Sequence, residues 1–243
     1  MKIGTCGFCE SRSQYFQDFC VIELQKTFYD FVKEEWLKKL RNQSNKDFEF
    51  TFKAIQIISH NKRSPTYRRF RSIFGNPDNY GHFKPTEEVY SAMEKMIVYA
   101  SILNANKIII QAPPDFSENE ENIKNLYEFF RKFSRRSVKY CLEIRGKWNE
   151  NTLKTIMEEF GIVHVVDLLK NKSLNGEFKY YRLHGKTGYS YFYNEGDLIY
   201  LKQILNENDY TMFNNTHMCE NAKTFQEMLK NDIKNTCQGN TIR

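Results

Sequence analysis

Short hydrophobic segments alternate with amphipathic segments along most of the chain, and most of the hydrophobic ones end in a polar or charged residue. Eight such segments are expected to be strands: Lys2–Thr5, Val21–Glu23, Phe48–Ala54, Lys107–Gln111, Tyr140–Glu143, Val163–Asp167, Tyr180–His184 and Tyr210–Asn214. Strands that alternate with helices build α/β folds, and eight units in 243 residues are typical of a (β/α)8 barrel. We therefore predict one TIM-type barrel domain over residues 1–243.

Apolar residues at spacings of three and four predict the intervening helices. These helices are expected near residues 13–19, 34–41, 87–105, 123–133, 153–160, 197–206 and 221–232. Residues 167–178 leave no room for a full helix, so the sixth unit is predicted to be abbreviated. Residues 235–243 are polar and are expected to fray.

The longest irregular stretch, residues 56–86, follows the third strand. It contains a basic cluster, with Tyr67 and Phe70 among the charges: Lys62, Arg63, Arg68, Arg69 and Arg71. A long loop after a barrel strand usually lies over the site. The cluster is either a nucleic-acid contact or a solvated helix face.

Polar residues at the ends of the predicted strands are the candidate site. Residues two apart share a face of a strand, so Glu143 pairs with Arg145, and Arg182 with His184. The carboxyl ends of parallel barrel strands meet at one mouth. The expected rim contains Glu23, Lys53, Gln111, Glu143, Arg145, Asp167, Arg182, His184, Asn214 and Asn215. Such a rim is either a set of ion pairs that closes the barrel or a functional site.

The functional interpretation assigns a role to each charged type. Arg145, Arg182 and Lys53 are expected to hold an anionic ligand such as a phosphorylated substrate. Glu143 and His184 are the expected general base and acid. Lys53 is a third catalytic candidate: it is a Schiff-base lysine if apolar neighbours lower its pKa, and a salt-bridged lysine otherwise.

Cysteines and histidines suggest further chemistry. Cys6-Gly7-Phe8-Cys9 lies at the first strand-to-helix turn and has the spacing of a thiol redox pair, although ordinary reduced cysteines also fit. A zinc site there requires more ligands, and Cys219 and His217 are available.

A metal at the mouth is a separate alternative. Five His residues are too few for a three-metal cluster. A single metal held by Glu143, Asp167 and His184 is disfavoured by the two nearby arginines. No metal is assigned, and the sequence leaves the identity of any cofactor open.

Several motifs in order resemble the YecE-like family, catalogued as domain of unknown function 72. They are Ile3–Phe8, Glu23 with Thr27-Phe28-Tyr29, Phe52–Ala54 with Ser59-His60, Gln111–Phe116, Leu142–Arg145 with Trp148, Tyr181–Gly185, and Phe213–Asn215 with Glu220–Ala222. The resemblance covers residues 3 to about 229. It implies a TIM-type barrel with a polar cavity at the strand carboxyl ends, places Tyr29 among the ligand-binding candidates, and carries no established activity.

The same resemblance implies a second function, and the sequence departs from the family's usual residues at two places. Similarity of this family to the apurinic endonuclease barrel implies possible nucleic-acid binding. Cys6 and Phe8 stand where Ser and Trp are more common, and Gly146-Lys147 replaces a His-Pro-Ser before Trp148. The departures affect the lining of the first and fifth strands.

Composition narrows the class of protein. A hydrophobic share of 40% and an aromatic share of 15% exclude a disordered chain. No segment approaches the roughly 20 apolar residues of a membrane span, and the chain begins with a strand-like segment, so we expect a cytoplasmic protein without a signal peptide. The net charge of +6 permits a phosphate-rich partner, although a Lys-rich surface explains it equally.

Three functions follow from these features. The first is an enzyme, such as a hydrolase or lyase, that acts on an anionic substrate at the barrel mouth. The alternative is a nucleic-acid-binding protein that uses Arg63, Arg68, Arg69 and Arg71. The second alternative is a thiol redox protein that uses Cys6 and Cys9.

Overall fold

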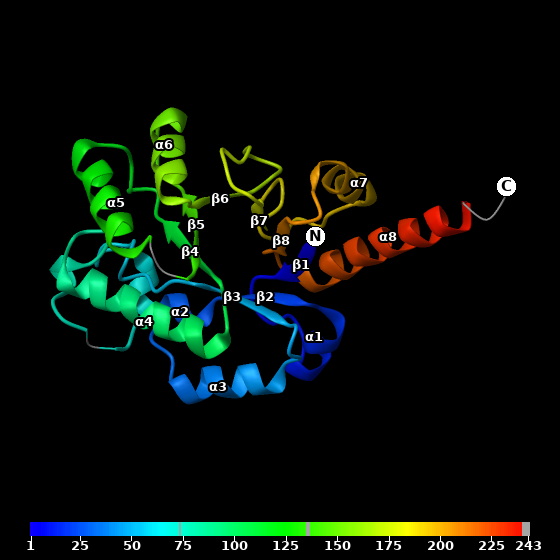
Figure 1. The fold of residues 1–243 in the computed structure, drawn as a ribbon, viewed down its shortest axis with the longest axis horizontal. Helices are drawn as coiled ribbons and strands as arrows, with labels where there is room; N and C mark the ends of the chain where they lie inside the picture. The colour runs from blue at the N-terminus through cyan, green and yellow to red at the C-terminus, as the bar shows by residue number, and fades with distance from the viewer. Residues whose placement is uncertain (73, 135–136, 240–243) are drawn as a thin grey trace.

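Eight parallel strands surround the centre of the molecule, and helices cover their outer side (Figure 1). The computed structural model describes residues 1–72, 74–134 and 137–239. The strands are β1 (Lys2–Thr5), β2 (Val21–Leu24), β3 (Glu49–Lys53), β4 (Lys107–Ala112), β5 (Lys139–Ile144), β6 (Val163–Val166), β7 (Tyr180–Leu183) and β8 (Tyr210–Phe213). From β2 to β8, strands adjacent in sequence pair in space, and β8 pairs with β1. The predicted (β/α)8 barrel is confirmed.

The barrel is nearly closed between β1 and β2. These two strands meet through one isolated parallel bridge, between Cys6 and Glu23. Gly4 makes their approach possible, because a Cβ at this position would lie 2.4 Å from the carbonyl oxygen of Val21. A residue with any side chain at position 4 would push the two strands apart.

The helices lie where the apolar spacing places them, with differences at their ends. They are α1 (Arg12–Asp18), α2 (Lys26–Tyr29), α3 (Glu34–Gln43), α4 (Glu87–Leu103), α5 (Glu120–Phe133), α6 (Glu150–Phe160), α7 (Glu195–Ile204) and α8 (Met218–Gly239). The short helix α2 was not predicted. Helix α8 continues beyond the predicted end at 232, so the expected fraying is wrong for residues 235–239, and residues 240–243 lie outside the described residues.

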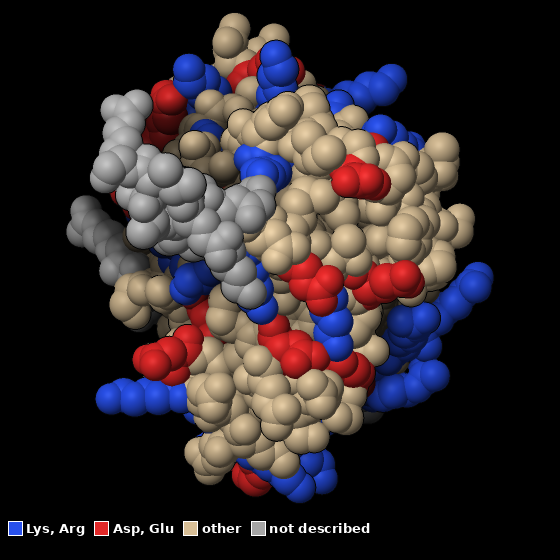
Figure 2. Space-filling view, turned by 90° about the vertical axis from the view of Figure 1, so that its right-hand side faces the viewer, with Lys and Arg blue, Asp and Glu red and all other residues tan. Residues whose placement is uncertain are grey.

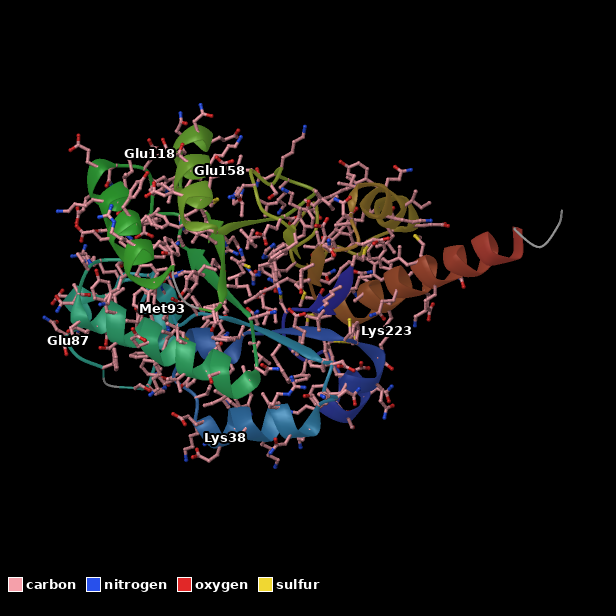
Figure 3. All side chains as sticks on the ribbon, in the orientation of Figure 1. Lys38, Glu87, Met93, Glu118, Glu158 and Lys223 are labelled. Atoms are coloured by element: carbon pink, nitrogen blue, oxygen red, sulfur yellow. A yellow bond between two sulfur atoms is a disulfide. The ribbon has the colours of Figure 1, made fainter. Side chains whose placement is uncertain are left out.

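The helices bury one face each against the strands. Leu126, Phe130 and Phe133 of α5 are fully buried at helical spacing, whereas charged residues such as Lys38 and Glu158 lie on the periphery (Figure 3). Each buried Phe or Leu contributes about 1.5–3 kcal/mol relative to an exposed one. This burial fixes the helices around the barrel.

Two connections at the carboxyl ends of the strands differ from an ordinary barrel unit. Residues 167–179, all of which the structure describes, form turns and irregular backbone between β6 and β7, which confirms the abbreviated sixth unit. The loop after β3 contains two short 3-10 helices, η1 (Pro65–Arg69) and η2 (Pro77–Asn79). In place of a helix, the first connection packs irregular backbone against β6, where Ser173 and Leu174 donate to His164.

The loop after β3 turns back onto its own beginning through a strained turn. Gly81, His82 and Phe83 have φ angles of 82°, 53° and 55°, and two of these residues carry side chains. Their backbone amides donate to the carbonyl oxygens of residues 57, 59 and 58. Left-handed backbone at non-glycine residues costs free energy and persists only where the surroundings hold it.

A disulfide joins Cys9, in the turn after β1, to Cys219, at the beginning of α8. Lys223 of α8 lies against the same turn (Figure 3), where its ammonium is 2.7 Å from Glu10 and 2.7 Å from Asp18. The expectation that these cysteines are reduced is therefore wrong for Cys9 and Cys219. The disulfide ties the two ends of the barrel sequence together.

The surface carries charges of both signs. On the face from which α8 projects, Lys and Arg side chains are interspersed with Asp and Glu (Figure 2). The positive net charge therefore forms no continuous basic patch among the described residues on that face. Among the described residues, no helix is both long and apolar enough to cross a bilayer.

Candidate active site

Arg182 of β7 lies inside the barrel, only 2% exposed, between two buried carboxylates. Its Nε donates to Glu23 of β2 at 3.1 Å, and its Nη1 donates to Glu143 of β5. Burial alone lowers the pKa of Arg182, but the two carboxylates outweigh burial and raise it. Arg182 is thus occupied by protein partners, as the ion-pair interpretation of the rim expects for this residue.

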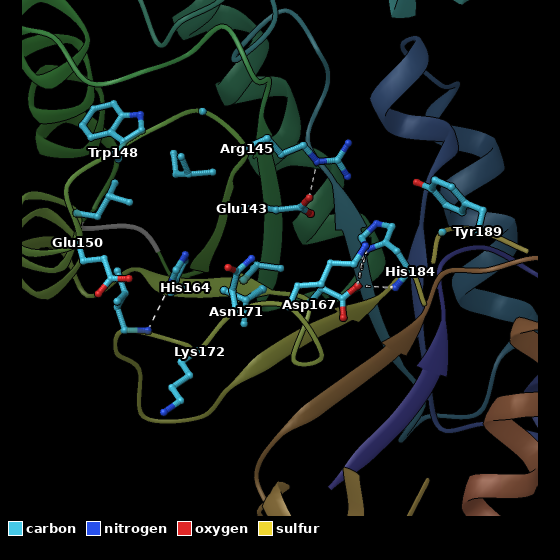
Figure 4. A pocket seen from close by; sticks show the side chains of 18 residues that line it. Glu143, Arg145, Trp148, Glu150, His164, Asp167, Asn171, Lys172, His184 and Tyr189 are labelled. Atoms are coloured by element: carbon cyan, nitrogen blue, oxygen red, sulfur yellow. Dashed lines mark hydrogen bonds and ion pairs between the residues drawn. The ribbon is translucent and has the colours of Figure 1, made fainter. Parts of the chain in front are cut away.

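Glu143 is held from two sides. Besides Arg182, the Arg145 Nε donates to Glu143 Oε1 at 2.7 Å (Figure 4). Burial raises the pKa of Glu143, but Arg182 and Arg145 outweigh it and hold the pKa well below its usual range. A carboxylate with so low a pKa is a weak proton acceptor, which argues against Glu143 as the general base.

Lys53 ends β3 beside these ion pairs and is only 6% exposed. Its Nζ lies 3.5 Å from the centre of the Phe28 ring, and none of the ion pairs among the described residues includes it. Burial, followed by the charge of Arg182, lowers the pKa of Lys53 to about 7. The interpretation of Lys53 as a salt-bridged lysine is therefore wrong, and the condition for a reactive amine is met.

His184 and Asp167 form a second polar group at the ends of β7 and β6. The Asp167 Oδ2 accepts the backbone amide of His184 at 3.0 Å and lies 3.6 Å from its Nδ1 (Figure 4). The other ring nitrogen, Nε2, is 3.0 Å from the Asn214 amide nitrogen. With that amide donating, Nε2 is the acceptor and Nδ1 carries the proton that faces Asp167.

A cavity of about 540 Å³ opens beside this pair (Figure 4). Its inner wall includes Glu143, Arg145, Asp167 and His184. Its outer wall includes Trp148, Glu150, His164, Lys170, Lys172 and Tyr189. Residues of β6 and of the loop after it also line the cavity, at the place where an ordinary barrel unit carries a helix. Its volume suits a metabolite-sized ligand.

The remaining predicted residues divide between the site and the scaffold. Gln111 accepts from Arg182 at 3.4 Å and belongs to the buried cluster. Tyr29 lies outside the cavity wall, with the Arg69 guanidinium 4.6 Å from its ring centre. Asn215 is buried and bonds to the Tyr191 carbonyl and to Asn221, so its contacts are structural.

Several residues of the site were missed from sequence. Trp148, Lys170, Lys172 and Tyr189 line the cavity, although only Trp148 belongs to a motif noted in the sequence. The signal for Lys170 and Lys172 was the short connection after β6, because a missing helix exposes the loop that replaces it, whereas Tyr189 lies in the loop after β7 and carried no such signal. His60 was noted in the loop but not assigned to the site.

The thiol and metal alternatives change with the structure. Cys9 pairs with Cys219, and Cys6 is buried, where burial and then Glu23 raise its pKa well above the usual value. A Cys6–Cys9 redox pair is therefore wrong, and the disulfide occupies two of the three sulfur atoms considered as zinc ligands, those of Cys9 and Cys219.

The single-metal alternative at the mouth gains no support from the described residues. Among them, the group of potential ligands whose atoms lie within 4.8 Å of one another is Cys9, Glu10 and Cys219. Glu143, Asp167 and His184 form no such group.

Comparisons with known proteins identify relatives of this barrel. A family model described as a protein of unknown function, DUF72, matches residues 10–241. No curated protein matches the chain.

Solved structures share the fold at low sequence identity. A DUF72 family protein from Enterococcus faecalis V583 superposes with a TM-score of 0.69 at 18% identity, covering 94% of this chain and 97% of the other. A DUF72 family protein from Thermotoga maritima MSB8 gives 0.59 at 18% identity, covering 94% and 98%. An AP endonuclease, family 2, from Brucella melitensis gives 0.56 at 9% identity, covering 89% and 93%.

Proposed function

Because the chain belongs to the DUF72 family, whose function is unknown, we propose from the site itself that it is an enzyme that binds a small anionic substrate in the cavity beside the barrel mouth. One observation carries this proposal. The cavity places the Arg145 cation and the Asp167–His184 pair on one wall, at the carboxyl ends of β5, β6 and β7. Catalytic residues of TIM barrels lie at this end of the strands.

The cations of the cavity are suited to an acidic group. The Arg145 side chain is 36% exposed and uses its Nε on Glu143, while a guanidinium carries further N–H donors on its Nη atoms. Lys170 and Lys172 add charge from the loop after β6. Arg182, in contrast, binds Glu23 and Glu143, so its role is to position them rather than to bind the substrate.

His184 is the group that moves a proton in this proposal. Asp167 orients the imidazole through Nδ1, and substrate that displaces the Asn214 amide reaches Nε2. An imidazole with a carboxylate on one nitrogen is a common general acid or base near neutral pH. Glu143, the earlier candidate for the base, keeps Arg145 in place instead.

Binding of inorganic phosphate, measured by titration calorimetry at low ionic strength, tests the anion site. We expect Arg145→Met to weaken binding at least tenfold, because a charge-assisted contact to phosphate is lost. Arg131→Met is the matched control, since Arg131 is exposed on α5 and does not line the cavity. Equal phosphate affinity in all three proteins contradicts the proposal.

Nucleic-acid binding is a second candidate, supported by the loop after β3. Arg63, Arg68 and Arg71 are exposed, and the ion pairs of the described residues do not include them. A gel shift with duplex DNA that weakens with salt, and that is lost in the R63Q/R68Q/R71Q variant, is the expected result. A shift that this variant retains counts against the loop.

A further inference from the structure

Lys53 is a buried amine that neither phosphate binding nor proton transfer by His184 requires. It lies inside the barrel at the carboxyl end of β3, with the Phe28 ring centre 3.5 Å from its Nζ. An aromatic face stabilises an ammonium much less than a carboxylate does in a desolvated site. The immediate surroundings therefore favour the neutral form of the amine.

The carboxylates nearest to Lys53 are already occupied. Glu23 binds Arg182 and accepts the Tyr180 hydroxyl at 2.9 Å, while Glu143 binds Arg182 and Arg145. Lys53 thus faces two carboxylates whose charge two guanidinium groups largely cancel. Its lowered pKa, about 7, agrees with this geometry.

His60, another neighbour of Lys53, is uncharged near neutral pH. His60 is buried at the beginning of the loop after β3, and burial, followed by the charge of Lys53, lowers its pKa to about 3. Its Nδ1 is 2.9 Å from the Ser59 hydroxyl. A neutral imidazole beside a neutral amine leaves that amine as the strongest nucleophile of the cluster.

A second buried lysine provides an internal reference. Lys107 opens β4 at the opposite end of the barrel and is 6% exposed, as Lys53 is. Its Nζ lies 2.9 Å from Glu49 Oε1 and 2.9 Å from Asn106 Oδ1. The two lysines differ in their partners and not in their exposure.

We propose that Lys53 is a nucleophile that forms a Schiff base with the carbonyl group of an aldehyde or ketone substrate. The Nζ lone pair attacks the carbonyl carbon, and the carbonyl oxygen takes a proton to give a carbinolamine. Loss of water then gives the imine, so the amine gives up two protons and the carbonyl oxygen leaves in that water. Hydrolysis reverses each step, and no oxidant or reductant is needed.

The cavity of the proposed function lies next to this amine. Glu143 and Arg145 line the cavity, and the charges of both act on the pKa of Lys53. Lys53 itself is not among the residues that line the cavity, so a carbonyl compound held by Arg145 must extend beyond the cavity wall to reach the amine. The inference that the substrate carries an acidic group rests on the proposed function, whereas the inference that Lys53 is a reactive amine does not.

Reductive trapping of the full-length protein tests the inference. Glyoxylate, a small anionic aldehyde, is incubated with the protein and sodium cyanoborohydride at pH 7, and modified lysines are located by peptide mass spectrometry. We expect modification of Lys53 at least tenfold faster than modification of Lys107. The signal disappears in Lys53→Arg and persists in Lys107→Arg. Lys53→Met, which is expected to fold stably, is the second negative control.

The outcomes separate this inference from the proposed function. Selective modification of Lys53 by glyoxylate but not by neutral acetaldehyde supports both. Equal, selective modification by both aldehydes supports the Lys53 nucleophile and removes the anionic part of the substrate. Modification of Lys53 no faster than that of Lys107 overturns the inference, even where phosphate binding through Arg145 is retained.

Discussion

Both ends of the barrel interior contain buried cations, but these cations differ in whether a carboxylate binds them. At the amino end, Glu49 accepts from Lys107 at 2.9 Å and from Tyr210 at 2.8 Å, and it also pairs with Lys2. At the carboxyl end, Arg182 forms ion pairs with both Glu23 and Glu143, and Lys53 has no ion pair with a carboxylate among the described contacts.

The difference teaches which end is built for stability and which for chemistry. A buried cation with a hydrogen-bonded carboxylate is compensated, whereas one without a carboxylate costs stability and shifts its pKa. Proteins retain a destabilising buried group where activity requires it. In a TIM barrel the catalytic groups lie at the carboxyl ends of the strands, which is where Lys53 lies.

Removing the central cation of the carboxyl end should have the largest effect. Arg182→Met leaves Glu23 and Glu143 buried without their shared partner, and we expect a loss of about 3–5 kcal/mol in the free energy of unfolding. Urea unfolding measures it. Arg145→Met, which removes the partly exposed partner of Glu143, should cost less than about 1 kcal/mol. Comparable losses for the two variants would show that Arg182 does not hold the cluster together.

Replacing the two buried lysines should change stability in opposite directions. Lys53→Met removes an uncompensated amine, and we expect a gain of about 4 kcal/mol at pH 7, because the pKa of Lys53 falls from an ordinary value of about 10.4 to about 7 and each unit corresponds to about 1.4 kcal/mol. Lys107→Met leaves Glu49 with Lys2 and Tyr210 only, and we expect a loss of about 2 kcal/mol. Losses in both variants, measured by urea unfolding, contradict the comparison.

The pH dependence of stability should isolate Lys53 with a smaller effect. The pKa of Lys53 is lowered to about 7, so between pH 7 and about 10 the unfolded chain binds the proton that the native protein has lost. Wild-type stability therefore rises relative to Lys53→Met across that window, by at most about 1.4 kcal/mol per pH unit.

The groups that face Lys53 do not obscure this trend. They are Arg182, Glu143, Arg145, Glu23 and His60. The pKa of Glu143 is lowered, that of Arg182 is raised and that of His60 is about 3, so these three groups keep their charge state between pH 7 and 10. A stability difference between the two proteins that stays constant over the window shows that Lys53 does not titrate there.

The sequence was sufficient for the barrel because its strands and helices are local patterns. It also placed Glu23, Glu143 and Arg182 at one mouth, since strand ends in a barrel converge. Which of them bind one another depends on distances across the barrel between residues 159 positions apart, as for Arg182 and Glu23. Local patterns carry no such information.

Two other features escaped the sequence for the same reason. The disulfide of Cys9 with Cys219 spans 210 residues, whereas the CxxC spacing pointed to a local partner. The sequence left two environments open for Lys53, a salt bridge and an apolar one. The choice between them depends on which cation the carboxylates Glu23 and Glu143 bind, and only the fold shows that this cation is Arg182.

A direct titration of the Lys53 amine tests the central claim most closely. Protein labelled with ¹³C and ¹⁵N at lysine is followed by NMR from pH 5 to pH 11, and the Lys53 signal is identified by its absence from Lys53→Met. The account predicts a midpoint near pH 7. A midpoint above pH 10, the range of an ordinary lysine, would show that the amine is compensated and would contradict the account.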